Sequence, residues 1–160
     1  MTAPEIRLDP ITESAFPEKF ETVVAGYAEQ NVSAGTWAAD EAIEKARAAC
    51  TQLLPDGFST PDNFLSVASD AASGEQIGFL WLALRRSADK LQAFIYDIEV
   101  GDEFRGRGYG RAIMLACVDQ ARGLGAGSVG LHVFGNNTVA RSLYTSLGFV
   151  ETNVVMSLQL

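Results

Sequence analysis

The segment of this 160-residue chain with the clearest chemical potential is a glycine- and arginine-rich stretch, Glu103-Phe104-Arg105-Gly106-Arg107-Gly108-Tyr109-Gly110-Arg111. It follows a predicted strand and opens a predicted helix. Glycines let the backbone approach a ligand closely, and the N–H groups in the first turn of a helix lack intrahelical acceptors. The helix dipole adds positive potential at that end, and arginines bind anions through paired hydrogen bonds. The spacing therefore predicts a backbone-lined anion site, with a flexible turn carrying solvated arginines as the alternative.

Two common phosphate-binding patterns do not fit this loop. A P-loop requires Gly-Lys-Ser/Thr, and the loop contains no lysine. A dinucleotide fingerprint that starts at Gly106 would need a third glycine at the position of Arg111. What remains is the pattern Arg105-x-x-Gly108-x-Gly110 between a strand and a helix.

Two carboxylates precede the loop on a predicted strand over residues 91–100. Strict alternation along this strand would place Asp97 and Glu99 on the face that also carries Ile95. Two acidic side chains on one face of a central strand are costly to bury unless they face water or a cleft. Either one can act as a general base. Alternatively, one of them belongs to a surface ion pair and the other caps the end of the strand.

The other candidate side chains are His132, the single histidine, and the two cysteines, Cys50 and Cys117. We expect His132 to be a half-buried structural residue on a strand, with a role as a base as the alternative. Each cysteine lies in an apolar helical stripe, which predicts packing and not nucleophilic catalysis. One histidine and two distant cysteines do not form a ligand set, so no metal is expected.

The periodicity of the chain predicts one mixed α+β domain over residues 1–160. We expect a strand at 6–8, helices at 17–31 and 42–54, and an antiparallel meander of strands at 64–69, 76–86 and 91–100. A helix from 107 or 108 to 122, a strand at 128–134, a helix at 139–147 and closing strands at 149–150 and 154–160 complete the order. Asn137 is predicted to cap the last helix, and Gly148 to end it.

Charge is distributed unevenly along the chain. Residues 1–104 contain 18 Asp or Glu and 7 Lys or Arg, whereas residues 105–160 contain 2 and 5. The net charge of −8 argues against a nucleic-acid partner, and the local positive charge at the loop suits a small anion. No apolar run approaches the roughly 18–20 residues of a membrane span, and no signal peptide is recognised. We therefore expect a cytoplasmic protein with no membrane partner and with reduced cysteines.

In its second half the sequence resembles the GNAT superfamily of acyl-CoA-dependent N-acyltransferases. The pattern Arg105-x-x-Gly108-x-Gly110 is similar to the pyrophosphate loop of that family. Residues 95–100 and 129–134 resemble its fourth and fifth strands, and residues 137–149 resemble its Asn…Ala-x-x-Leu-Tyr…Gly-Phe helix. These motifs cover residues 91–150, whereas residues 1–60 fit only by the order of helices and strands.

The resemblance implies a mostly antiparallel central sheet, splayed between its fourth and fifth strands and flanked by about four helices. It implies direct transfer of an acetyl group from acetyl-CoA to a primary amine in a ternary complex. The backbone at Ile98 and Val100, with a strand bulge near Val100, is expected to pair with the pantetheine arm and to supply an oxyanion donor. Further cofactor contacts are implied for Asn137 and for the loop residues Arg105, Gly106, Arg107, Gly108, Tyr109, Gly110 and Arg111.

Tyr144 is implied as the general acid that protonates the departing thiolate, with an ordinary core-facing aromatic as the alternative. Glu99 or Asp97 is implied as the base, since the family places its base variably and some members have none. The acceptor is an unidentified small-molecule or peptide amine. Acidic residues such as Glu29 and Glu44 would attract a cationic acceptor unless they form only a solvated face. A non-catalytic acyl-CoA-binding domain is the alternative function, and the resemblance leaves a homodimer open.

Overall fold

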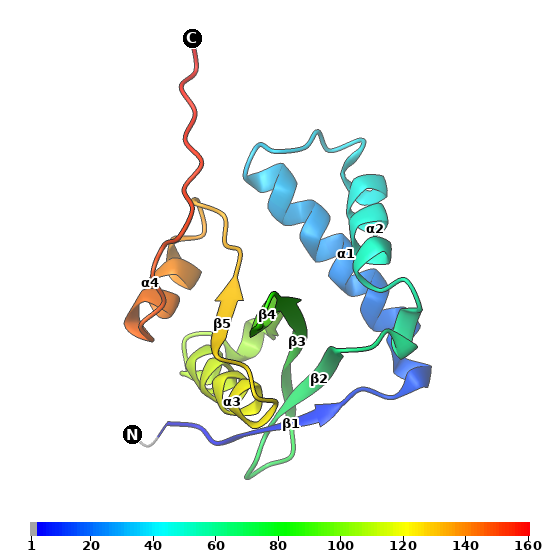
Figure 1. The fold of residues 1–160 in the computed structure, drawn as a ribbon, viewed down its shortest axis with the longest axis vertical. Coiled ribbons are helices and arrows are strands. Elements are labelled where there is room, and N and C mark those ends of the chain that lie inside the picture. The colour runs from blue at the N-terminus through cyan, green and yellow to red at the C-terminus, as the bar shows by residue number, and fades with distance from the viewer. Residues whose placement is uncertain (1–2) are drawn as a thin grey trace.

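The computed structural model describes residues 3–160, in which a five-stranded sheet carries helices on both faces (Figure 1). The strands are β1 (Ile6–Pro10), β2 (Asn63–Asp70), β3 (Gln76–Ser87), β4 (Lys90–Val100) and β5 (Ser128–Leu131), and they lie in this order. Strands β1 to β4 pair antiparallel, whereas β4 and β5 pair parallel. The mixed, mostly antiparallel sheet expected from the sequence is confirmed.

Four α-helices occur among the described residues, namely α1 (Phe16–Ser33), α2 (Ala42–Leu53), α3 (Tyr109–Gly123) and α4 (Thr138–Ser146). The predicted signals at the ends of α4 are confirmed. The side chain of Asn137 accepts a hydrogen bond of 3.2 Å from the Ala140 N–H, and Gly148 follows the helix with φ of 93°. This positive φ is the conformation that favours glycine at a helix C-terminus.

The sheet separates two clusters of buried apolar side chains. One cluster joins α1 and α2 to Phe79 and Trp81 of β3, which are 1% and 2% exposed. The other joins α3, through Ile113 and Met114, to Leu80 of the same strand. Because successive residues of a strand point to opposite faces, β3 contributes to both clusters. Burial of each large side chain is worth roughly 1.5–3 kcal/mol, so these two clusters hold the helices against the sheet.

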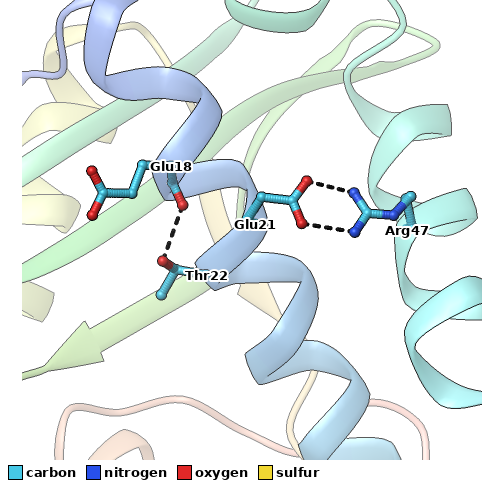
Figure 2. A network of polar contacts seen from close by, with 4 residues as sticks. All are labelled: Glu18, Glu21, Thr22 and Arg47. Carbon is cyan, nitrogen blue, oxygen red and sulfur yellow. Dashed lines mark hydrogen bonds and ion pairs between the residues drawn. The ribbon is translucent and has the colours of Figure 1, made fainter.

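An exposed ion pair also links α1 to α2 (Figure 2). Arg47 donates to both carboxylate oxygens of Glu21, at 2.5 and 2.7 Å, which lowers the pKa of Glu21 and raises that of Arg47. Next to Glu21, the Thr22 hydroxyl donates to the carbonyl of Glu18 in the preceding turn (Figure 2). Exposed ion pairs contribute little to stability, so this contact guides the pairing of the helices more than it stabilises them.

A bulge in β4 interrupts its pairing with β3. Trp81 lies opposite Asp97, whereas the next residue, Leu82, lies opposite Ile95, so Tyr96 is the extra residue. The Tyr96 ring packs against Trp81, with 4.8 Å between ring centroids. The predicted bulge near Val100 is therefore wrong in position, because the structure places the irregularity four residues earlier.

The bulge also changes which side chains of β4 share a face. Ile95 belongs to the α3 cluster, whereas Glu99 forms an ion pair with Lys19 of α1. Asp97 lies two residues before Glu99 in the regularly paired part of the strand, so its side chain points to the same face as that of Glu99. The prediction that Ile95, Asp97 and Glu99 share one face is wrong, because the extra residue reverses the alternation between Ile95 and Asp97.

The C-terminal end differs from the sequence expectation in two ways. The strand predicted at 128–134 ends at Leu131, and residues 149–160 form no strand. No backbone hydrogen bond joins residues 150–160 to the rest of the described chain, and the tail extends beyond the body of the molecule (Figure 1). An isolated extended segment has no partner for its backbone groups, so the closing strands do not form within this chain.

Gly78 of β3 is required for the close approach of the end of β4. A Cβ at this position would lie 2.1 Å from the Glu99 carbonyl oxygen and 3.1 Å from Cδ1 of Ile113. We expect Gly78→Ala to destabilise the fold by roughly 1–3 kcal/mol, since the backbone of β4 must move. Gly26 in α1 is the matched control, because no atom lies within 4 Å of its Cβ position. Gly26→Ala should stabilise the helix by about 0.5–1 kcal/mol.

Thermal unfolding followed by circular dichroism measures both changes. Equal midpoints for Gly78→Ala and the parent chain would contradict the predicted clash.

Candidate active site

Strands β4 and β5 are paired over four residues only, Gln92–Ile95 with Ser128–Leu131. Strand β4 continues to Val100, whereas the chain after Leu131 leaves strand geometry. The predicted splay between the fourth and fifth strands is thereby confirmed. Beyond Ile95 the edge of β4 that faces β5 has no strand partner among residues 3–160, so its backbone groups can pair with an extended ligand segment.

A cavity of about 70 Å³ occupies the opening between the diverging segments. Residues of β4, of the segment after β5, of α1 and of α4 line it: Gln30, Ile95, Tyr96, Asp97, Ile98, Leu131, His132, Val133, Phe134, Asn137 and Tyr144. The structure thus brings together four residues that the sequence nominated, Asp97, Ile98, Asn137 and Tyr144. Glu99 does not line the cavity.

Asp97 is the most unusual ionisable group of the cavity. Its Oδ2 atom is buried and has no hydrogen-bond partner among the described residues. Burial, followed by the negative charge of Glu99, raises the pKa of Asp97 from its ordinary value of 3.8 to about 8, although Lys19 opposes the shift. A carboxyl group in this setting exchanges its proton near neutral pH, as a general base requires.

Glu99 has a different environment from Asp97. Its carboxylate accepts a hydrogen bond of 3.1 Å from the ammonium group of Lys19, which also lies 4.5 Å from the centroid of the Phe79 ring. Both members of the ion pair are about 30% exposed, at 26% and 31%. This carboxylate is therefore engaged in an ion pair, whereas the Oδ2 atom of Asp97 has no partner among the described residues.

Tyr144 projects from α4 into the same cavity and packs against Phe149, with 5.8 Å between ring centroids. Burial and the nearby charge of Asp97 raise the pKa of Tyr144 above its ordinary value. The phenol therefore keeps its proton at neutral pH and can donate it. The same ring also contacts the apolar cluster around α3, so the core-facing alternative describes part of its environment.

The structure contradicts the expectation for His132 and agrees with the expectation for the two cysteines. His132 is exposed and lies just after β5, so the expected half-buried position on a strand is wrong. Its ring makes an edge contact with Phe134. Cys50 and Cys117 are buried and free, and burial raises their pKa to about 11 and about 12. Both stay protonated at neutral pH, which agrees with a packing role.

The glycine loop has the backbone geometry of an anion site. Gly106 and Gly108 have φ of 73° and 87°, and Gly108 is the N-cap of α3. The N–H groups of residues 106–111 donate to no acceptor within residues 3–160. A Cβ on Gly110 would touch Leu143 of α4 at 3.4 Å, so this glycine allows close packing of the two helices. The loop therefore presents several unpaired donors at the positive end of a helix dipole.

The three arginines of the loop have different surroundings. Arg105 turns back to the end of β4, where it donates to the Val100 carbonyl at 3.3 Å and pairs with Asp102. Arg111 donates to the Ser146 hydroxyl at 2.9 Å. Arg107 is exposed and makes no ion pair or side-chain hydrogen bond with the described residues. Arg107 is accordingly the arginine of this loop that is free to bind an anion.

Tyr109 also has a structural role within the loop. Its hydroxyl donates to Asp70 at the end of β2, at 3.0 Å, and its ring packs edge-on against Phe104. These contacts hold the first turn of α3 against the sheet. Its side chain is therefore engaged within the protein, while its backbone N–H remains one of the unpaired donors of the loop.

Sequence reasoning missed two residues near the cavity. Gln30, near the end of α1, lines the cavity, and Lys19 fixes Glu99 from 80 positions earlier in the chain. Neither residue belongs to a motif, and both reach β4 only because α1 crosses the sheet. Within residues 3–160, His, Cys, Asp and Glu form no group of three that could hold a metal ion. In the same part of the chain, no helix combines the length and apolar character of a membrane span.

Comparison with known proteins agrees with this geometry. The sequence model of the acetyltransferase (GNAT) family matches residues 36–149. The uncharacterized N-acetyltransferase YycN of Bacillus subtilis is 36% identical over 155 residues, which cover 97% of this chain and 99% of YycN. A second protein of that species, the uncharacterized N-acetyltransferase YdgE, is 34% identical over 96% of this chain and 97% of its own length.

The fold is also shared with a solved structure. The crystal structure of the putative acetyltransferase YycN superposes on this chain with a TM-score of 0.91 and 35% identity, over 97% of this chain and 98% of the other. The family match, the two similar sequences and this common architecture show that the chain belongs to the acetyltransferase (GNAT) family.

Proposed function

We propose that this N-acetyltransferase uses acetyl-CoA to acetylate a primary amine by direct attack in a ternary complex, with Asp97 as the general base and Tyr144 as the general acid. The observation that carries the proposal is the buried, unpaired Oδ2 of Asp97 in the cavity that Tyr144 also lines. Such an orphaned oxygen is costly unless a ligand provides its partner. The proton of an incoming amine would satisfy it.

The residues around the cavity suit an acyl-CoA cosubstrate. The loop at 106–111 offers unpaired N–H groups and the free guanidinium of Arg107 to the pyrophosphate. The unpaired edge of β4, at Ile98 and Val100, offers backbone groups to the pantetheine arm. Asn137 lies at the same cavity, although its side-chain oxygen already caps α4. When bound, acetyl-CoA supplies the activated acetyl group.

Only a neutral amine is nucleophilic, and its nitrogen becomes positively charged as it attacks. The base must therefore accept a proton from this nitrogen. Asp97 has the proton affinity for this step, because its environment disfavours the carboxylate. Glu99 acts on Asp97 through its charge and fixes Lys19 at a distance from it. We therefore assign the base to Asp97 and a positioning role to Glu99.

The acid must protonate the sulfur of the departing thiol. Tyr144 retains its phenolic proton at neutral pH and lines the cavity from α4. Backbone N–H groups near Val100 would stabilise the developing oxyanion. No acyl-enzyme is required, since both cysteines are buried thiols.

The acceptor is assigned only as a primary amine. Two of the acidic residues in this region are neutralised by neighbours, since Glu21 of α1 pairs with Arg47 and Glu41, the N-cap residue of α2, pairs with Lys45. The acidic surface therefore attracts a cationic amine less strongly than its residue count suggests. We further propose a cytoplasmic location, which the two free cysteines support.

Release of thiol from acetyl-CoA over a panel of primary amines tests the function, and pH profiles test the base. The parent chain should gain kcat/KM as the pH rises, with a midpoint near the Asp97 pKa of about 8. Asp97→Asn should lose roughly 100-fold in kcat/KM and lose this limb of the profile. Glu99→Gln should stay active and shift the midpoint to lower pH, because a negative charge beside Asp97 is removed.

An unchanged profile for Asp97→Asn would exclude Asp97 as the base. Tight binding of CoA without turnover of any amine would instead indicate a non-catalytic acyl-CoA-binding domain.

Asp97→Asn should also change the stability of the fold, and the size of this change should depend on pH. The pKa of Asp97 is higher in the folded than in the unfolded chain, so the stability it contributes at low pH is lost as the pH rises from about 4 to about 8. Asp97→Asn has no such loss. Its unfolding midpoint should exceed that of the parent chain at pH 8 and approach it at pH 4. A variant less stable than the parent at pH 8 would contradict the burial of this carboxyl.

Removal of the Tyr144 hydroxyl isolates the acid. Tyr144→Phe keeps the ring and its contact with Phe149, so the fold and the affinity for CoA should be retained. We expect kcat to fall roughly 10- to 100-fold with nearly unchanged dissociation constant for CoA. Steady-state kinetics and calorimetry on one preparation measure the two quantities. Parent-like kcat would show that the hydroxyl is not the acid.

Gly108 should be essential for the anion site, although not because a side chain would enter the ligand path. Its Cβ would point toward Pro4, at 3.4 Å from Cδ, and its φ of 87° strains any other residue. Gly108→Ala should weaken CoA binding about tenfold as the loop changes conformation. Gly123→Ala, at the other end of α3 and with no atom within 4 Å, is the control. Calorimetry that shows equal affinities for both variants would contradict the loop assignment.

A further inference from the structure

Arg85 of β3 is a cation without a charged partner. Its guanidinium carbon lies 3.6 Å from the centroid of the Phe94 ring and 4.8 Å from that of the Tyr96 ring. Its Nε and Nη2 atoms donate to the Tyr96 hydroxyl at 3.0 and 2.6 Å. Arg85 is exposed, and it forms no ion pair with a carboxylate of residues 3–160. The two rings therefore fix the orientation of a guanidinium whose charge is not neutralised.

The hydrogen-bonding groups that remain at this site are all donors. Arg85 has more N–H groups than the two that Tyr96 accepts, and a guanidinium cannot accept a hydrogen bond. The bonds from Arg85 occupy the acceptor positions of the Tyr96 hydroxyl, whose own proton has no acceptor within the described chain. A ligand at this site must therefore supply the acceptors. An arginine beside a hydroxyl matches the two oxygens of a carboxylate.

The Phe94 ring supports Arg85 and is not part of the core. Phe94 is half-buried, yet it belongs to neither of the two apolar clusters formed by the described residues. Its ring lies 5.0 Å from the Tyr96 ring, measured between centroids. On β5 its neighbour is Gly130, where a Cβ would lie 3.4 Å from the Phe94 ring and 2.9 Å from Nε2 of Gln92. Glycine at this position therefore places no side chain beside the two rings.

Tyr96 connects Arg85 to the active-site cavity. Both Tyr96 and the next residue, Asp97, line the cavity. Arg85 lies opposite Gln92 in the antiparallel pair, so it shares a face of the sheet with Phe94, two residues further along β4. Tyr96 packs against the cluster that holds α1 on this same face. The guanidinium of Arg85 is thus separated from the cavity by about the length of one tyrosine side chain.

We propose that the amine acceptor also carries a carboxylate, which Arg85 and the Tyr96 hydroxyl bind while the amine reaches Asp97. This inference rests on the proposed function for the fate of the amine. The two ends of the site are a proton acceptor in the cavity and a fixed cation outside it. Because a tyrosine side chain separates them, the amine and the carboxylate must lie several bonds apart, as in an ω-amino acid.

The charge of such an acceptor agrees with the surface of the protein. An ω-amino acid carries no net charge, so its capture does not require a strongly acidic surface. Two of the acidic residues near α1 and α2 are in fact paired with cations, Glu21 with Arg47 and Glu41 with Lys45. Local contacts at the two ends of the acceptor would then provide its affinity and its selectivity.

Calorimetry with matched ligands tests the inference. The parent chain, with CoA present, is titrated with glycine, β-alanine, γ-aminobutyrate and ε-aminocaproate, and with the amide of each acid. The longer acids should bind roughly 10- to 100-fold more tightly than their amides, because only the acids pair with the charge of Arg85. Glycine and its amide should bind about equally, since their two groups are too close to span Tyr96. An equally large acid preference for glycine would overturn the proposed spacing.

Variants assign the preference to Arg85. Arg85→Gln should make the longer acids and their amides bind about equally, and Tyr96→Phe should reduce the difference. Arg86→Gln is the matched control, because this neighbouring arginine is also exposed and points to the opposite face of β3. It should keep the acid preference of the parent chain. Equal binding of acids and amides by the parent chain, or an acid preference that survives Arg85→Gln, would overturn the proposal.

Turnover measurements separate this inference from the proposed function. The binding experiment requires no acetyl transfer, so it tests the carboxylate site even if no amine is acetylated. Thiol release with the same pairs of ligands should show the acid preference mainly in KM, since Arg85 binds a part of the acceptor that does not react. Acid-selective binding without turnover would support the carboxylate site and contradict the proposed function. Turnover that is equal for acids and amides would support the proposed function and contradict the carboxylate site.

Discussion

The pairing of β4 with β5 ends after Ile95 and Leu131, and the position of the candidate active site depends on this divergence. Two parallel strands that stayed paired would satisfy each other's backbone groups and leave no room between them. The bulge at Tyr96 adds a residue to β4 and turns the Tyr96 ring onto Trp81. From that point β4 follows β3 and no longer follows β5. The cavity, the unpaired strand edge and the acidic group all lie where the two strands separate.

The divergence also explains the unusual state of Asp97. Its Oδ2 atom is buried and has no hydrogen-bond partner among the described residues, and the carboxyl group lines the cavity where the two strands separate. Lys19 could neutralise it, but Glu99 and the Phe79 ring hold that ammonium group. The fold therefore keeps a carboxyl with a raised pKa, which reduces stability and gives the group the proton affinity that the proposed base requires. If Asp97 were well paired, the fold would be more stable and the carboxylate would bind a proton less tightly.

Local signals predicted the parts of the site that depend on local geometry. Glycines between a strand and a helix predicted the loop, and Asn137 predicted the start of α4, because caps and turns involve only neighbouring residues. The position of the bulge was not predictable from the residues themselves, since residues 94–100 read as an unbroken strand without glycine or proline. The orientation of Arg105 toward Val100 and the reach of Lys19 to Glu99 depend on tertiary contacts, which no spacing in the sequence encodes.

The C-terminal tail shows a different reason for failure. Its alternation predicted a strand, and the pattern itself is sound, but a strand is defined by its neighbour as well as by its own sequence. Within residues 3–160 the tail has no such neighbour. Alternation is therefore a necessary condition for a strand and not a sufficient one, because the backbone groups of the segment must also find hydrogen-bond partners on a neighbouring strand.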